Sequence, residues 1–255
     1  AQKFNSSKML NLLPMPHLHK TDVICRFFFR LKTYKMEQNK IYHIDCFDGF
    51  KQLEDKSVNH VFTSPPYNRK RNDKYEHHND CIDDYFGWLC NVIDECLRVS
   101  KGYVFFNIMK NYYNKQDVFK LIGKYSENIV EIIVWEKTNP LPANGNNITN
   151  AYEFFLIFGD DALKSNTTYT KNIISTAVNS DMTTDHKAIM KQDVAEWFIK
   201  SFTKENDLIL DCFMGAGTTA ITCKYNRRNY IGFELNKKYV ELSNKRIYDA
   251  LGMFA

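Results

Sequence analysis

From Met36 onward, short apolar segments alternate with segments whose apolar residues recur at helical spacing. The apolar segments predict strands over residues 41–45, 58–63, 103–108, 129–135, 152–158, 208–211 and 230–234. The helical spacing predicts helices over 84–99 and 188–202, a third that opens at Thr218 and a fourth from Lys237. Strands that alternate with helices indicate a largely parallel sheet covered on both faces, so we expect an α/β fold.

Residues 1–35 differ in kind from the rest of the chain. They carry seven Lys and Arg residues against one acid, whereas the remaining residues hold 27 bases and 29 acids. They show no sustained period, and a coherent pattern begins only with MEQNKIYHIDCF. We therefore expect residues 1–35 to be a leader or a non-native extension and residues 36–255 to form a single domain. The alternative is a basic arm that contacts a polyanion.

Composition excludes several classes of protein. The chain is 44% hydrophobic and 25% charged, as in an ordinary globular domain. No apolar run approaches the roughly 20 residues that span a bilayer, so we expect no membrane contact. The seven cysteines are odd in number and no pair has CxxC spacing. This pattern argues against a zinc site or a disulfide framework, predicts no metal, and fits a reducing, cytoplasmic compartment.

The stretch TSPPYN, residues 63–68, directly follows the apolar pair Val61-Phe62. Two adjacent prolines cannot donate to a sheet ladder, so the strand must end here. Ser64 offers a side-chain acceptor, and the carbonyl of Pro65 offers a second one that the following Pro66 holds rigid. Tyr67 offers a face on which a planar base can stack. The stretch therefore predicts a binding loop at the end of a strand.

A second motif, DCFMGAGTT, occupies residues 211–219. Asp211 ends a strand, Gly215 and Gly217 make a tight turn, and Thr218 and Thr219 open a helix. Such a turn lets backbone approach a ligand closely, and the helix N-terminal amides are free to bind it. Glu234, at the end of the next strand, suits the hydroxyls of a ribose, and Phe213 is expected to wall the pocket. The alternative is an ordinary glycine turn with a capping threonine.

Together the two motifs suit one kind of chemistry. An amino group on an aromatic ring is a poor nucleophile because its lone pair is delocalised into the ring. It attacks an electrophilic methyl group when acceptors hold its hydrogens and the two reactants are placed in line. Ser64, Pro65, Pro66 and Tyr67 supply those parts, and neither a metal nor a nucleophilic side chain is required.

TSPPYN and DCFMGAGTT together resemble the motifs of the amino-methylating DNA methyltransferases, which methylate cytosine N4 or adenine N6. The similarity covers most of residues 39–249, including HIDCFDGFKQLEDKSVNHVFTSPPYN, where Asp45 matches an acid that contacts the cofactor adenine. VWEKTNPLP and YEFFLIF are similar to the family's later hairpin. The catalytic motif precedes the glycine motif, as in the family's permuted β group. The resemblance therefore implies a circularly permuted Rossmann-like fold with an antiparallel hairpin at one sheet edge.

The resemblance also implies an activity. We expect S-adenosylmethionine as cofactor and the exocyclic amine of a flipped base in double-stranded DNA as substrate. Cytosine N4 is preferred, because a serine before Pro-Pro is commoner in the cytosine enzymes, and adenine N6 is the alternative. A protein-glutamine or RNA methyltransferase would ordinarily carry the glycine motif first. A further alternative is a fold of this kind that binds nucleic acid without catalysis.

DNA contacts are expected beside the catalytic motif. Arg69, Lys70, Arg71 and Lys74 follow it, where a loop that grips the DNA backbone would lie, although a solvated surface loop is equally consistent. Lys137 and the asparagines of the hairpin loop are candidates for base edges. The polar range 160–185 is expected to be a short recognition insert. Its shortness suggests a second subunit or a partner, and a cognate restriction nuclease is one such partner.

Overall fold

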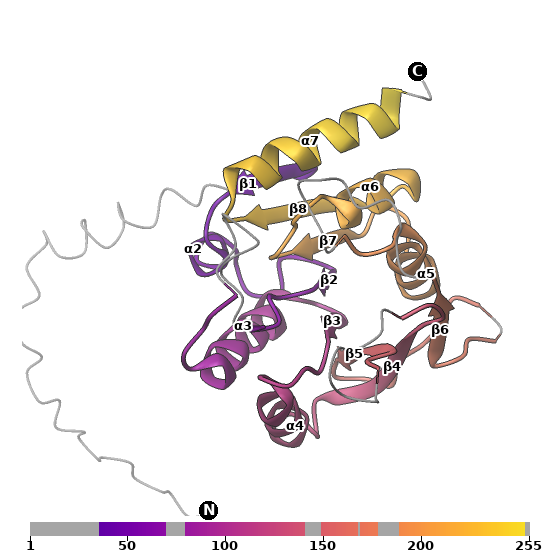
Figure 1. Ribbon diagram of the computed structural model, residues 1–255. Coiled ribbons are helices and arrows are strands. Elements are labelled where there is room, and N and C mark those ends of the chain that lie inside the picture. The colour runs from indigo at the N-terminus through magenta and orange to yellow at the C-terminus, as the bar shows by residue number, and fades with distance from the viewer. Residues whose placement is uncertain (1–35, 70–79, 141–148, 168, 178–188, 253–255) are drawn as a thin grey trace, which may run out of the picture. The chain divides into compact units, whose positions relative to one another are not determined.

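The structure is a computed structural model that describes residues 36–69, 80–140, 149–167, 169–177 and 189–252 (Figure 1). Residue contacts divide the chain into two units, Ala1–Tyr34 and Lys35–Ala255, and the described residues all belong to the second. The strands are β1 (Lys40–His43), β2 (His60–Thr63), β3 (Val104–Ile108), β4 (Ile129–Lys137), β5 (Tyr152–Phe158), β6 (Ile173–Thr176), β7 (Leu208–Asp211) and β8 (Asn229–Glu234). The helices are α2 (Cys46–Phe50), α3 (Tyr85–Val99), α4 (Lys115–Lys124), α5 (Gln192–Phe202), α6 (Thr218–Tyr225) and α7 (Lys237–Gly252).

The strands form one sheet in the order β1-β8-β7-β2-β3-β5-β4-β6. Neighbours from β1 to β3 are parallel, whereas β5 is antiparallel to both β3 and β4. This arrangement confirms the expected α/β fold with its antiparallel hairpin, and β6 adds an outer strand parallel to β4. Because β2 pairs with β7, the two segments that follow these strands leave the sheet side by side. The catalytic motif and the glycine motif therefore meet, although 148 residues separate Thr63 from Asp211.

Apolar side chains fill both faces of the sheet. Helices α2, α3 and α4 cover one face, and α5, α6 and α7 cover the other (Figure 1). Ring clusters dominate the second face, where Phe155 and Phe198 lie 4.1 Å apart between centroids. Strand side chains alternate between the two faces, so each strand contributes to both cores. The two cores fix the strand ends from which the site is built.

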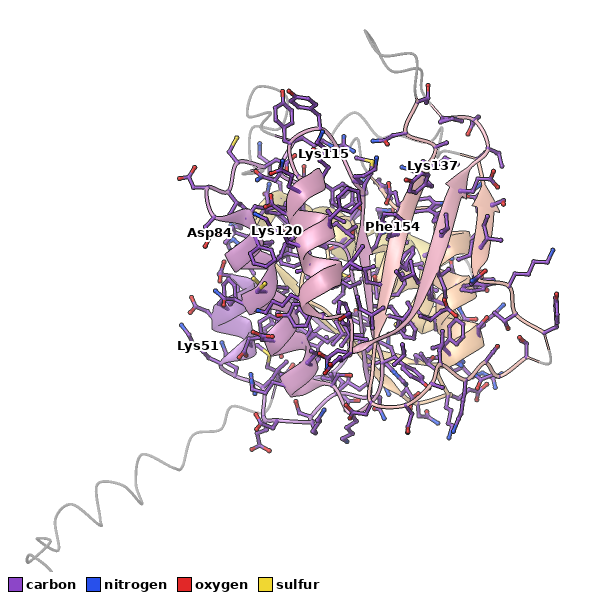
Figure 2. All side chains as sticks on the ribbon, turned by 90° about the horizontal axis from the view of Figure 1, so that it is seen from below. Lys51, Asp84, Lys115, Lys120, Lys137 and Phe154 are labelled. Carbon is purple, nitrogen blue, oxygen red and sulfur yellow. The ribbon has the colours of Figure 1, made fainter. Side chains whose placement is uncertain are left out.

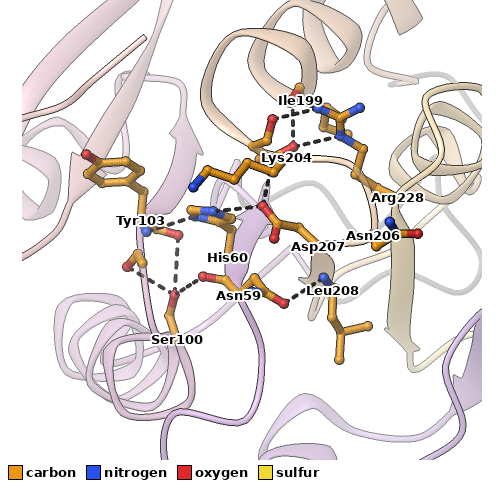
Figure 3. Close-up of polar contacts among 12 residues, drawn as sticks. Asn59, His60, Ser100, Tyr103, Ile199, Lys204, Asn206, Asp207, Leu208 and Arg228 are labelled. Carbon is orange, nitrogen blue, oxygen red and sulfur yellow. Dashed lines mark hydrogen bonds and ion pairs between the residues drawn. The ribbon is translucent and has the colours of Figure 1, made fainter. Parts of the chain in front are cut away.

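A polar cluster joins the amino ends of β2, β3 and β7 (Figure 3). The His60 Nδ1 accepts the Tyr103 amide hydrogen at 3.0 Å, so the ring carries its own proton on Nε2, which lies 3.5 Å from the Asp207 carboxylate. Burial alone would raise the pKa of Asp207, but hydrogen bonds from His60 and the Lys204 amide outweigh it and hold the pKa below its ordinary value. The cluster therefore fastens the strand ends opposite to those that carry the two motifs.

Three elements were not predicted from the sequence: α2, α4 and β6. The largest boundary error is at α5, which begins at Gln192 rather than at residue 188, so Ile189 and Met190 line a cavity instead of a helix face. Smaller errors occur at β1, which ends at His43 rather than at residue 45, and at β2, which begins at His60 rather than at residue 58. β6 occupies part of the range expected to be a recognition insert. Residues 168 and 178–185 of that range lie outside the described part of the chain.

Candidate active site

The TSPPYN loop is fastened at its base. The Tyr85 hydroxyl donates to the carbonyl of Pro66 at 2.6 Å. Asn68 adopts a left-handed conformation, with φ of 51°, and its buried amide both donates to and accepts from the backbone of Ile82 at 3.0 and 2.9 Å. The Tyr67 carbonyl accepts from the side chains of Asn111 and Asn114 at 2.7 and 2.9 Å. The loop is therefore held from three sides, and its residues are pre-positioned.

A buried polar cluster lies beneath the loop. The Ser64 hydroxyl is 3.0 Å from Asn107 Oδ1 and 2.9 Å from the Tyr67 hydroxyl. The Tyr67 hydroxyl also lies 2.6 Å from Asn107 Oδ1 and 2.9 Å from Glu153 Oε2, and Glu153 pairs with Lys137. Burial and the nearby Glu153 raise the pKa of Tyr67 well above its ordinary value, so this phenol stays protonated. The cluster therefore fixes the Ser64 hydroxyl.

Sequence reasoning left Asn107 open between a polar lining residue and a satisfied strand end, missed Glu153, and misplaced Lys137. The signal was present, since each of the first two is the polar residue inside an apolar strand, FFNI and YEFFLIF. Asn107 is fully buried and Glu153 is 5% exposed. Lys137 was expected to reach base edges, but its ammonium group pairs with Glu153 and lies 5.1 Å from the centre of the Trp135 ring. Lys137 belongs to the floor of the site.

The glycine motif is organised by the Asp211 carboxylate. Thr63 and Thr219 donate hydroxyl hydrogens to it at 2.8 and 2.6 Å, and the amide of Phe213 donates at 3.1 Å. Burial raises the pKa of Asp211, while these hydrogen bonds oppose the rise. Three donors from the protein engage the carboxylate, so its observed contacts position the turn. Its predicted contact with a cofactor stays a prediction.

Glu234 presents a carboxylate to the same place. Its Oε2 accepts the Gly215 amide hydrogen at 2.8 Å, and its Oε1 accepts the Asn236 amide hydrogen at 2.7 Å. Burial raises the pKa of Glu234 above its ordinary value, and the two amides oppose the rise. Each oxygen keeps a second lone pair, so the fixed carboxylate can accept hydrogen bonds from a ligand.

Gly217 plays a different part from the one expected. Its φ is 81°, and a Cβ at this position would lie 2.7 Å from the Cβ of Ser243 in α7. The close approach that this glycine permits is therefore to a helix of the protein. Gly217 is also missing from the lining of the cavity as far as the described residues define it. The structure gives Gly217 a packing role, and its expected ligand contact stays a prediction.

The two motifs open onto one cavity of about 400 Å³. Most of the predicted site residues line it, namely Asp45, Ser64, Pro65, Pro66, Tyr67, Arg69, Asp211, Phe213, Gly215, Thr218, Thr219 and Glu234. Trp88 joins them, with its ring centre 5.5 Å from that of Phe213. Cofactor pockets typically enclose about 300–1,000 Å³ and mix apolar walls with a few fixed polar groups. The cavity has this character.

Two predicted residues have contacts that qualify their roles. Asp45 caps α2, because its Oδ1 accepts the Phe47 amide hydrogen at 2.9 Å, while the side chain also reaches the cavity wall. The Arg69 guanidinium lies 5.9 Å from the centre of the Tyr67 ring, so a base that stacks on that face must displace it. The other predicted DNA contacts, Lys70, Arg71 and Lys74, lie outside the described residues.

Two kinds of feature are absent from the described part of the chain. No group of three or more His, Cys, Asp or Glu side chains there is arranged to hold a metal ion. None of the helices over the described ranges is both long and apolar enough to cross a membrane.

The fold and the cavity define a class of protein. A strand-end acid, a glycine turn that opens a helix, and a carboxylate on the next strand form a cofactor site of the Rossmann-like α/β type. Comparison with known proteins agrees. The family model described as DNA methylase, for N6- and N4-methyltransferases, matches residues 58–245.

Relatives and solved structures agree with this match. The type II methyltransferase M1.MboII of Moraxella bovis is 25% identical over 82% of this chain and 96% of its own length. M.BglII of Bacillus subtilis is 28% identical over 82% of this chain and 69% of its own. Among solved structures, the cytosine-N4-specific PvuII DNA methyltransferase shares the fold, with a TM-score of 0.68, 18% identity and coverage of 86% and 93%. The M1.HpyAVI–SAM complex superposes with a TM-score of 0.60 at 24% identity, covering 81% and 98%.

This chain belongs to the DNA methylase family of N6/N4 amino-methyltransferases. The family is a class of S-adenosylmethionine-dependent enzymes, and the resemblance of the two motifs to it is confirmed.

Proposed function

We propose that this chain transfers a methyl group from S-adenosylmethionine to the exocyclic amine of a base flipped out of double-stranded DNA, with cytosine N4 preferred over adenine N6. One observation carries the proposal. The Ser64 hydroxyl and the Glu234 carboxylate line the same cavity, so an amine acceptor and a ribose acceptor share one space. Family membership supports the reaction. The geometry supports Ser64 as the residue that binds the amine and Glu234 as the residue that binds the ribose.

The residues present fit S-adenosylmethionine. Glu234 would accept from the ribose hydroxyls, since two backbone amides already hold its carboxylate in place. Asp45 would lie near the adenine, between the end of β1 and α2. The rings of Phe213 and Trp88 would wall the cavity. When bound, the cofactor supplies an electrophilic methyl group.

The chain's own residues prepare the amine. The Ser64 oxygen would accept one amine hydrogen, and the Pro65 carbonyl is the proposed second acceptor. Acceptors on both hydrogens favour a pyramidal nitrogen, whose lone pair is free to attack. Pro66 is fixed by Tyr85, so the acceptors need no rearrangement when the base arrives. Tyr67 would hold the face of the flipped base.

DNA would lie over the carboxyl ends of the parallel strands. Arg69 lines the cavity there. Beside it, the loop between β3 and α4 exposes Tyr112 and Tyr113, which are 77% and 54% accessible, with Lys115 5.7 Å from the centre of the Tyr112 ring. Figure 2 shows Lys115 at the end of the sheet where Lys137 pairs with Glu153, so Lys115 is the one of these two lysines that is available to a phosphate. Lysines suit phosphates, and exposed aromatic rings suit unstacked bases.

The experiment is a nucleoside analysis. DNA incubated with the protein and S-adenosylmethionine is digested and its nucleosides are measured by mass spectrometry. N4-methylcytosine is the expected product, and N6-methyladenine without N4-methylcytosine would instead assign the adenine reaction. Ser64→Ala should lose most turnover, on the order of the 10²–10³-fold seen when one fixed catalytic hydrogen bond is removed. Calorimetry should show unchanged cofactor affinity in this variant. Wild-type protein that binds the cofactor and methylates no DNA would overturn the proposal.

A further inference from the structure

The cluster beneath the catalytic loop holds fewer protons than its contacts require. The oxygens of Ser64, Tyr67, Asn107 and Glu153 make four contacts of 2.6–3.0 Å. The Asn107 Nδ2 faces the Phe154 carbonyl at 3.2 Å, which leaves its Oδ1 facing the two hydroxyls. With Glu153 paired to Lys137 as a carboxylate, only the two hydroxyl protons serve four oxygen–oxygen contacts.

A set of oxygens short of protons is suited to accept one. Methylation of an amine leaves a proton to be removed, because the nitrogen gains a carbon and retains two hydrogens until one departs. Ser64 is the residue expected to hold such a hydrogen. A lone serine hydroxyl is a weak base, so the proton needs a route to a stronger acceptor.

We propose that Ser64, Tyr67 and Glu153 form a proton relay that removes the amine proton, with Glu153 as its terminal acceptor. The amine proton passes to Ser64 Oγ, the Ser64 proton to Tyr67 Oη, and the Tyr67 proton to Glu153 Oε2. The electron pair of the broken N–H bond stays on nitrogen, and the Glu153 carboxylate becomes neutral. Each protein step crosses 2.9 Å. The proton returns to solvent between turnovers.

Two features of the surroundings support this route. Lys137 holds an ammonium beside Glu153, which compensates the carboxylate charge in a site where Glu153 is only 5% exposed. The raised pKa of Tyr67, caused by burial first and by Glu153 second, means that the phenol does not ionise alone. It transfers its proton only while receiving that of Ser64. Asn107 keeps both hydroxyl oxygens in line through its Oδ1.

The relay rests on the proposed function and is tested by single-turnover methylation of DNA. Glu153→Gln keeps the shape of the side chain and removes the proton acceptor. Tyr67→Phe keeps the aromatic ring and removes the hydroxyl that passes the proton on. Each should slow methyl transfer by about 10²–10⁴-fold, the range of a lost acid–base group, while cofactor affinity stays unchanged. The double variant should be no slower than the slower single variant, because either substitution alone already interrupts the proton relay. Glu136→Gln, an exposed carboxyl on the same hairpin, is the matched control.

A second readout separates proton transfer from support of the loop. In mixtures of light and heavy water, the wild-type rate should fall nonlinearly with the fraction of heavy water, because several protons move together. In Tyr67→Phe the dependence should be linear. If Glu153→Gln fails to fold in thermal unfolding, Tyr67→Phe carries the test alone. Wild-type rates in the variants, or losses that multiply in the double variant, would overturn the relay and leave the proposed function intact. A wild-type protein that methylates no DNA would remove both.

Discussion

Glu234 shows how a single side chain is prepared for a ligand before the ligand arrives. Backbone amides of Gly215 and Asn236 hold its two oxygens, so the carboxylate keeps one orientation. The same burial that fixes it also raises its pKa above the ordinary value of 4.5. The group therefore gains a proton at a higher pH than an exposed glutamate does.

This gives a pH prediction for cofactor binding. The ribose acceptor is fully present above the raised pKa of Glu234 and is lost as pH falls through it. The affinity for S-adenosylmethionine should therefore fall on acidification, and it should begin to fall above the titration of ordinary glutamates. Glu234→Gln should bind more weakly by roughly 1–3 kcal/mol and show no such fall. Titration calorimetry across pH measures both. Equal pH dependence in wild type and variant would refute the assignment, and Glu241→Gln, at an exposed position of α7, is the control.

At the scale of elements, the turn between β7 and α6 is shaped by the helix that packs on it. Gly217 has φ of 81°, and a side chain there would meet Ser243 of α7. The Arg246 guanidinium also donates a hydrogen bond to the carbonyl of Ala216, so α7 contacts the turn through both Ser243 and Arg246. The turn that supports the cavity is therefore held by the packing of α7.

Gly217→Ala is expected to destabilise the protein by about 1–3 kcal/mol, because the added methyl group both strains the backbone and collides with Ser243. Chemical unfolding in urea measures the change. Gly123→Ala is the matched control: nothing lies within 4 Å of a Cβ at this position in α4, so the change should be neutral or stabilising by up to about 1 kcal/mol. Equal stability of the two variants would contradict the packing role of Gly217.

The elements differ in how far sequence reasoning reached them. Strands and long helices carry strong periodic patterns, so β5 and β7 were predicted to the residue and α3 to within one. The helix α2 has only five residues, too few to show helical spacing. The strand β6 is as short as β7, but its sequence IIST is half polar and mostly not buried, whereas LILD of β7 is fully buried. Motifs pointed to the cavity because the residues within each motif are close in sequence. The floor beneath it was missed because Asn107 and Glu153 reach Tyr67 only through strand pairing.

At the scale of the whole molecule, charge does not by itself direct the chain to DNA. Residues beyond 35 hold 27 bases and 29 acids, so any attraction to phosphate must be local. Residues 110–124 supply one such patch, with four lysines against one acid beside exposed Tyr112 and Tyr113. The loop is anchored, since Asn111 and Asn114 bond to the catalytic loop.

Removing both tyrosines tests whether this surface meets DNA. Tyr112→Ala with Tyr113→Ala should weaken binding of a fluorescent random-sequence duplex by roughly tenfold, or about 1.4 kcal/mol, near the value of one lost stack. Fluorescence anisotropy reports the change, and cofactor affinity should stay constant. Tyr248→Ala on α7, where the ring is equally exposed at 77%, should leave DNA binding unaltered. Unchanged anisotropy in the double variant would assign the DNA path to another surface.

The antiparallel course of β5 has one more consequence. Because β5 runs back from the carboxyl end of the sheet, Glu153 enters the floor of the site next to the loop that joins β4 to β5. Strand pairing alone sets its position, and a slip of one residue would turn it to the opposite face. The acceptor in the floor is therefore inherited only as long as β5 keeps its register against β3 and β4.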